Sequence, residues 1–467
     1  MTVRSELAWL DIASVLEVVG RREVRVIDVL ESVLHRIDRF NPALNAYVSV
    51  MADAARAEAA AADAELSGGH HRPLHGVTIA VKDMIHVQGW TTTGGSRTLL
   101  SYIAPQDADC VARLRAAGAL LIGKLHTHEL AAGATSASEV FGQAKNPWNT
   151  NHVPGGSSGG SAIAIAAGLA HGTLGTDTLG SVRMPAAFCG VVGLKPTAGR
   201  ISRQGVVMRS WTLDHVGLFT RRVCDAALLL QVLAGFDPND AYASKRPVPD
   251  FSARLTTDLQ GMRVGVLADA YFDDRLDSEI DAAFDAAVGV FDKLGCQTGA
   301  APFPLAAAAQ AASMLITFAE ASSTQDEVLR SELSAHYGQD VRAALQLGEL
   351  ISARQYLRAM RVRPMVQQEL GGLLRRFDVL VCPTTSVLPP RTEGIAPETS
   401  TRFARNTRPF SLAGLPALSV PAGFSREGLP IGLQIIGRPF DEATVLRVGH
   451  AYEAATPWHS LRPSDPA

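Results

Sequence analysis

The sequence has little that would support a disulfide-bonded, zinc-binding or membrane-spanning protein. Only five of its 467 residues are cysteines, and they are scattered and form no C-x-x-C pair. This usage indicates neither a disulfide framework nor a zinc ribbon, and it favours a reducing, cytoplasmic compartment. No stretch approaches the about 20 uncharged apolar residues of a membrane span. The N-terminal segment mixes charged and apolar residues, unlike a signal peptide. We therefore expect no membrane partner.

An excess of charge of either sign is also absent. The chain has 43 basic and 46 acidic side chains, which gives a formal net charge of −3 at pH 7. Nucleic-acid-binding proteins usually carry a basic excess, so no nucleic-acid partner is expected. Charged residues make up 19% and hydrophobic residues 47%, a balance that rules out intrinsic disorder and allows a large core.

Helix and strand patterns alternate along the chain. Helix is expected over the first 40 residues, where apolar residues three and four positions apart form one face from 26 to 40, and an alanine-rich helix facing the surface is expected over 52–66. Val77–Val81 is a β-branched run without helical period, and further strand and helix patterns alternate after it. Such alternation favours a sheet covered by helices on both faces. The sequence therefore predicts one large α/β domain over 1–467.

Four parts are expected within this domain. N-terminal helices over 1–70 precede a core over 71–235. A stretch rich in proline and turn-forming residues then introduces a helical excursion over 240–370. The chain is expected to return to the sheet over 375–458.

The segment 154–197 carries the strongest functional pattern. GGSSGG at 155–160 opens an alanine-rich helix, and a second glycine-bearing turn, TDTLGS, follows at 176–181. A glycine–serine run alone is more often a flexible loop or a helix cap. Two such turns between apolar segments favour a site where backbone N–H groups approach a ligand closely, as an oxyanion hole requires.

Three shorter motif matches are weaker. GGSSG at 155–159 matches the G-x-S-x-G elbow, but the NPWNTNHVP segment before it is not a strand. GALLIGK at 118–124 nearly matches a P-loop, but Leu125 replaces the magnesium-binding Ser or Thr. HTHE at 126–129 has metal-ligand residue types without a second cluster, which favours a structural role. No metal and no other cofactor is therefore expected.

Over residues 6–458 the chain resembles the amidase signature family. The matching motifs are VKDMI, TTTGGS, GKLHTHELA, FGQAKNPW, the GGSSGGSA and TDTLGSVRMPAAFCGVVGLKPT loops, FDVLVCPT and RPFSLAGLPALSVPAGF. The resemblance implies that family's fold, with a mixed β-sheet core between helices, and its Ser–cis-Ser–Lys triad. Matched position by position, the triad falls on Lys82, Ser157 and Ser181. The separation of 24 residues between the two serines is the one the family shows.

The chemistry of such a triad is consistent with its residue types. A serine hydroxyl is a poor nucleophile at neutral pH and needs an adjacent base. Lysine can be that base only when neutral, so Lys82 is expected to be desolvated, because burial lowers a lysine pKa. Ser157 would then relay a proton from Ser181 to Lys82 and later supply one to the leaving amine.

The resemblance also assigns the surroundings of the triad. Backbone N–H groups of Ser181 and the three preceding residues would bind the oxyanion. The family usually has glycine where this chain has Leu179, and we expect that change to affect the pocket rather than abolish activity. The expected oxyanion and substrate-binding residues are Thr178, Leu179, Gly180, Ala131 and Gly133, and the expected scaffold residues are Asp177, Arg183 and Ser158.

These features predict an amidase that hydrolyses C–N bonds of small carboxamides or anilides through a serine acyl-enzyme. Carbamate cleavage by the same triad is an alternative, and so is the glutamine-hydrolysing component of a tRNA-dependent amidotransferase. A homodimer is a possible assembly, since homodimers are common in the family. The excursion and 405–409 are expected to wall the cleft, with Phe318, Tyr337 and Tyr356 as candidate lining or core residues.

Overall fold

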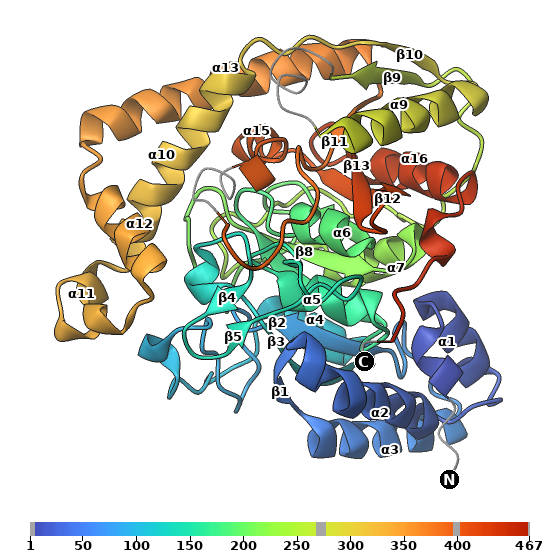
Figure 1. Cartoon of the computed structure of the whole chain (residues 1–467). Coiled ribbons are helices and arrows are strands. Elements are labelled where there is room, and N and C mark those ends of the chain that lie inside the picture. The colour runs from blue at the N-terminus through green and yellow to red at the C-terminus, as the bar shows by residue number, and fades with distance from the viewer. Residues whose placement is uncertain (1–4, 268–276, 396–401, 466–467) are drawn as a thin grey trace.

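Eleven strands from along the chain join into one mixed sheet in the computed structural model, which describes residues 5–267, 277–395 and 402–465 (Figure 1). The strand order is β1-β3-β2-β6-β8-β7-β12-β13-β11-β9-β10. The strands are β1 Tyr47–Val50, β2 Thr78–Lys82, β3 Leu120–Leu125, β6 Gly172–Asp177, β7 Val192–Lys195, β8 His215–Thr220, β9 Arg263–Val266, β10 Gln297–Ala300, β11 Val379–Pro383, β12 Ala417–Phe424 and β13 Pro430–Ile436. A separate two-stranded sheet pairs β4 Ala137–Ser138 with β5 Gly142–Gln143.

Helices cover both faces of the large sheet, as the sequence predicted. Leu418 of β12 packs towards α16, whereas the next residue, Ser419, faces α6, because successive strand residues point to opposite faces. The helices are α1 Ile12–Gly20, α2 Val26–Leu44, α3 Ala52–Ser67, α4 Asp109–Ala116, α5 Gly159–Ala166, α6 Arg183–Cys189, α7 Val223–Leu233, α9 Ser278–Lys293, α10 Ala306–Thr324, α11 Asp326–Leu329, α12 Gln339–Glu349, α13 Ala353–Arg376, α15 Arg408–Ala413 and α16 Glu442–Ala454.

The N-terminal helices follow the expected pattern with one difference. The apolar face predicted over 26–40 is buried in α2. The alanine-rich α3 is not simply a surface helix, since Ala55, Ala59 and Ala62 are buried against its neighbours. Alanine is small enough to let a helix approach a sheet closely, so its lack of bulk does not indicate exposure. Residues 1–4 of the expected N-terminal part lie outside the described residues.

The helical excursion begins later than the sequence indicated. Strands β9 and β10 lie within the expected range 240–370 and pair in parallel at the edge of the large sheet. Their sequences, RVGV and QTGA, have four residues each, too few to show a strand period. The true excursion consists of α10 to α13; α11 and α12 lie away from the sheet, whereas α10 and α13 share an apolar cluster with β11 (Figure 1). Residues 268–276 of the expected range lie outside the described residues.

None of the described helices combines the length and the apolar character needed to cross a bilayer.

Candidate active site

Lys82 ends β2 in the middle of the sheet, where its side chain is fully buried. Its Nζ donates to Ser157 Oγ at 2.7 Å and to Thr176 Oγ1 at 2.8 Å, the latter from the neighbouring strand β6. Burial lowers the pKa of Lys82 to about 7, although Asp214 and Asp177 act to raise it. A lysine with this pKa is largely neutral just above neutral pH, as a general base must be.

Ser157 lies in a tightly packed segment that leads into α5, and not in a flexible loop. The peptide bond between Gly156 and Ser157 is cis. A Cβ at Gly160 would lie 2.5 Å from the His126 backbone nitrogen, so the glycines here allow close packing. Ser158 Oγ donates to the Thr176 carbonyl at 3.1 Å, which ties this segment to β6. The strand that an α/β-hydrolase elbow requires before the serine is not present at 145–156.

Ser181 follows β6 on a turn whose path is fixed by hydrogen bonds. Asp177 accepts from the backbone N–H groups of Gly180 at 2.8 Å and Val182 at 3.2 Å. Thr407 Oγ1 donates to the Leu179 carbonyl at 2.6 Å. Gly180 has a φ of 131°, and a Cβ there would lie 2.0 Å from Thr407 Oγ1, so only glycine fits.

These contacts show which of the expected oxyanion donors already have a hydrogen-bond partner. The Gly180 N–H donates to Asp177 Oδ1, and its role as an oxyanion donor stays a prediction. Within the described part of the chain, the N–H groups of Thr178, Leu179 and Ser181 make no backbone or side-chain hydrogen bond outside regular strand pairing. The three residues all line the cavity described below, so they remain the candidates for binding an oxyanion.

The expected scaffold residues Asp177 and Arg183 form an ion pair in which both side chains are fully buried. Although burial acts to raise it, the Arg183 guanidinium holds the pKa of the Asp177 carboxyl well below its usual range. Arg183 also donates to the Thr407 carbonyl at 3.0 Å, to Gln434 Oε1 at 2.7 Å and to Ser411 Oγ at 2.6 Å. The pair therefore joins the Ser181 turn to the C-terminal third of the chain.

A cavity of about 350 Å³ opens beside Ser181. Of the expected substrate-binding residues, Ala131, Gly133, Thr178 and Leu179 line it, whereas Gly180 does not. Phe318 lines it too, while Tyr337 packs in a small apolar cluster and Tyr356 OH donates to Glu320. The full lining is Ala131, Ala132, Gly133, Ala134, Gly156, Thr178, Leu179, Ser181, Met184, Arg209, Met314, Thr317, Phe318, Asp340, Ala344, Ala404 and Arg408.

Several functional residues were not found from the sequence. Thr176 binds Lys82, and Asp214 accepts from Thr178 Oγ1 at 2.6 Å. Arg209 brings charge into the cavity, as do Asp340 and Arg408, which stand in the excursion and in the segment 405–409 that were expected to wall the cleft. Asp214 stands directly before β8, a position that could have suggested it. Nothing local marks Arg209 or Asp340, because the cavity is assembled from segments far apart in the sequence.

The HTHE segment makes protein contacts of the kind expected for a structural role. His126 Nε2 lies 3.1 Å from the Gly142 carbonyl, and His128 Nε2 lies 3.0 Å from Asp340 Oδ2. Glu129 accepts from Ser96 Oγ at 2.6 Å. Among the described residues no group of three or more His, Cys, Asp or Glu is arranged to hold a metal ion.

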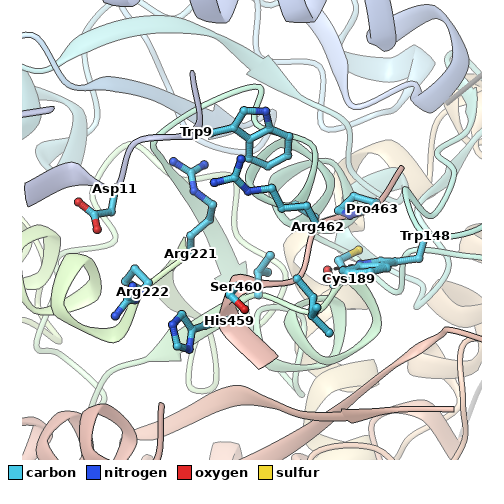
Figure 2. A pocket seen from close by; sticks show the side chains of 14 residues that line it. Trp9, Asp11, Trp148, Cys189, Arg221, Arg222, His459, Ser460, Arg462 and Pro463 are labelled. Carbon is cyan, nitrogen blue, oxygen red and sulfur yellow. Dashed lines mark hydrogen bonds between the residues drawn. The ribbon is translucent and has the colours of Figure 1, made fainter. Parts of the chain in front are cut away.

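A second cavity, of about 230 Å³, shares no lining residue with the first (Figure 2). Trp9 lines this second cavity. The guanidinium carbon of Arg462 lies 4.4 Å from the centroid of the Trp9 ring, and that of Arg221 lies 5.8 Å from it. Arg221 also donates to the Leu10 carbonyl, and Trp148 Nε1 donates to the Cys189 carbonyl at 2.8 Å. These contacts fasten the N-terminal and C-terminal segments to the core.

The family model described as Amidase matches residues 28–446. The chain belongs to the amidase signature family. It is 40% identical to the A-type subunit of glutamyl-tRNA(Gln) amidotransferase from Roseiflexus sp. (strain RS-1), over 98% of this chain and 99% of that protein. Among solved structures it matches a bacterial aryl acylamidase with a TM-score of 0.91 at 27% identity, over 98% of this chain and 99% of that one. It also matches a chain of a vestigial protein complex linked to the origins of an s-triazine catabolic enzyme, with a TM-score of 0.90 at 33% identity, over 95% and 98% of the two chains.

As a member of this family, the chain is a hydrolase that acts on C–N bonds, and its mixed sheet with flanking helices is the fold of the family.

Proposed function

We propose that the protein hydrolyses a small carboxamide through an acyl-enzyme on Ser181, with Lys82 as the base and Ser157 as the relay between them. The observation that carries this proposal is the buried Lys82 Nζ, 2.7 Å from Ser157 Oγ, with a pKa lowered to about 7. Lys82 contacts two serine and threonine hydroxyl groups, whereas the buried Lys124 forms an ion pair with Asp83.

The proton moves in both directions along this relay. Neutral Lys82 accepts a proton from Ser157, which takes one from Ser181 as its Oγ bonds to the amide carbon. The carbonyl oxygen gains negative charge and is held by the N–H groups of the turn. Protonated Lys82 then returns the proton through Ser157 to the leaving nitrogen, and the C–N bond breaks. Water repeats the sequence on the ester and restores Ser181.

Two substrate classes fit the cavity. Its alanine, methionine and phenylalanine lining supports a small carboxamide or anilide, as does the structural similarity to an aryl acylamidase. Glutamine is supported more strongly by the curated relatives, which are glutamyl-tRNA(Gln) amidotransferase components at 38–40% identity. Arg209 and Asp340 in one cavity also offer a partner for each charge of an amino acid. Carbamate cleavage is supported only by the shared chemistry of the triad.

Ammonia release separates these candidates. The purified chain is given glutamine, a series of primary amides and p-nitroanilides, and carbamates, and Ser181→Ala serves as the control. Turnover of glutamine alone supports the amidotransferase component, and turnover of aryl or alkyl amides supports a free amidase. No turnover of any of these, or equal turnover by Ser181→Ala, contradicts the proposal.

The oligomeric state depends on whether the protein is a free amidase or an amidotransferase component. We propose a homodimer for a free amidase, whereas an amidotransferase component would need a partner protein. Light scattering on the purified chain gives its mass in solution, and a mass of one chain contradicts the homodimer. We also propose a reducing, cytoplasmic location, supported by five cysteines that are all free thiols.

A further inference from the structure

A loop beside the cavity carries Arg209, which takes no part in the proposed proton relay. Arg209 is only 9% exposed and lines the same cavity as Ser181. The backbone N–H groups of Arg209 and Ser210 donate to Asp214 Oδ2 at 2.7 and 2.9 Å. The other oxygen of that carboxylate accepts from Thr178 Oγ1. One buried carboxylate therefore fixes Arg209 relative to the turn that carries Ser181.

The same loop is held from its other side by Glu320 of α10. Glu320 accepts from the Thr212 backbone N–H at 3.0 Å and from Thr212 Oγ1 at 2.8 Å. Tyr356 OH of α13 donates to it at 2.8 Å. The loop is thus fixed between β8 and the helical excursion, so the backbone that carries Arg209 is held in place before a ligand binds.

The Arg209 guanidinium retains its positive charge and has donors to spare. Burial lowers the pKa of Arg209 to about 10, so the group stays protonated at neutral pH. In the described part of the chain its backbone N–H donates to Asp214 and its guanidinium is in no ion pair, although the charges of Asp214 and Asp340 act on it from further away. A buried cation with unused donors beside a nucleophile is suited to bind an anionic group in a bidentate manner.

A second guanidinium reaches the same cavity from another element. Arg408, the first residue of α15, is buried and lines the cavity. The opposing charge in the lining is Asp340, whose side chain is 68% exposed and is bonded to His128. Because solvent screens the exposed Asp340, its carboxylate offsets the charge of the enclosed Arg209 only in part.

We propose that Arg209 binds a carboxylate on the substrate, so that the enzyme prefers carboxamides with an anionic acyl chain. This inference rests on the proposed function, because it concerns the substrate that reaches Ser181. Arg209 is the residue that determines the preference, and Asp340 at the more exposed side can contribute only if the substrate also carries an ammonium group.

The test compares two amides of similar shape and different charge. Glutaramate carries a carboxylate, whereas 5-oxohexanamide has a neutral methyl ketone in its place. We expect wild-type kcat/KM for glutaramate to exceed that for 5-oxohexanamide by about 10-fold or more, the usual effect of hydrogen bonds to a charged group. Arg209→Met should remove this preference mainly by raising KM for glutaramate, and Arg209→Lys should restore part of it.

Arg354→Met is the matched control, because Arg354 is an exposed arginine on α13 that does not line the cavity. It should leave both substrates unchanged. Equal kcat/KM for the two amides in the wild type would overturn the anion preference and leave the proposed hydrolysis intact. An equal loss on both amides in Arg209→Met would do the same, since it would show a purely structural role.

A binding measurement keeps the two proposals separate. Titration calorimetry of glutarate into Ser181→Ala should show binding that is lost when Arg209→Met is added. If wild-type protein hydrolyses no amide but glutarate still binds through Arg209, the proposed reaction fails and the anion site stands. If glutarate does not bind to Ser181→Ala, the anion site is overturned whatever the activity.

Discussion

At the scale of single residues, the main result is a lysine whose burial gives it the pKa of a base. Lys82 must lose its proton to act, so kcat/KM should rise with pH through the lowered pKa of about 7 and then level off on the alkaline side. Lys82→Ala should lower the rate by about 10²- to 10⁴-fold. A pH–rate profile of both proteins measures this. A maximum near pH 5 would indicate a carboxylate base and contradict it.

Leu179 is the residue at which the chain departs from its family. It is not among the residues with positive φ, so leucine is accommodated in the turn without the strain that glycine would avoid. Its side chain lines the cavity and packs against an apolar cluster below it. Leu179→Gly should remain active. It should change the ratio of kcat/KM between small and bulky amides by an amount that corresponds to about 1–2 kcal/mol of activation free energy. Assays on a graded amide series measure the ratio, and an equal decrease for every substrate would refute a role in specificity.

At the scale of elements, the turn from Asp177 to Ser181 depends on the glycine at its centre. Gly180→Ala would place a Cβ 2.0 Å from Thr407 Oγ1 at a φ of 131°, so the turn must move or distort. We expect a loss of about 1–3 kcal/mol in stability and a large loss in kcat. Gly428→Ala is the control, since it has a φ of 77° with nothing within 4 Å and lies in an exposed turn. Thermal unfolding and kcat measure both variants; if Gly180→Ala behaves like the control, the packing argument is wrong.

The sequence predicts an element well where its apolar residues repeat with a clear helix or strand period. The α2 helix and β2 have clear apolar periods and were expected close to their observed places. Strand β6, which carries Thr176 and Asp177, has the sequence GTLGTD, and two glycines conceal its strand character. Strands β9 and β10 are stabilised by pairing at the sheet edge and not by their own composition.

At the scale of the whole molecule, the Asp177–Arg183 pair links the catalytic turn to segments more than 200 residues away. Arg183→Met would leave the Asp177 charge buried without its partner, which typically costs about 3–5 kcal/mol. Urea unfolding at neutral pH measures the loss. Arg263→Met removes an ion pair with a 44% exposed arginine side chain and should cost much less stability, because solvent screens this pair. Equal losses in the two variants would contradict the role assigned to the buried pair.

Only part of the candidate site could be predicted from the sequence. Lys82, Ser157 and Ser181 stand in contiguous motifs, so matching those motifs was sufficient to select them. The segment 405–409, which holds Arg408, was expected to wall the cleft, but the charged lining residues Arg209 and Asp340 were not singled out, because they come together only in the folded chain. Their contribution depends on long-range packing, which no local pattern encodes.

The central claim is that Ser181 forms the acyl-enzyme, and trapping that intermediate tests it most directly. An aryl ester is mixed with the enzyme, the reaction is quenched with acid, and the acylated peptide is identified by mass spectrometry. We predict one acyl group, on Ser181, in the wild type, and none in Ser181→Ala. An acyl group on any other residue, or undiminished amide turnover by Ser181→Ala, would contradict the account.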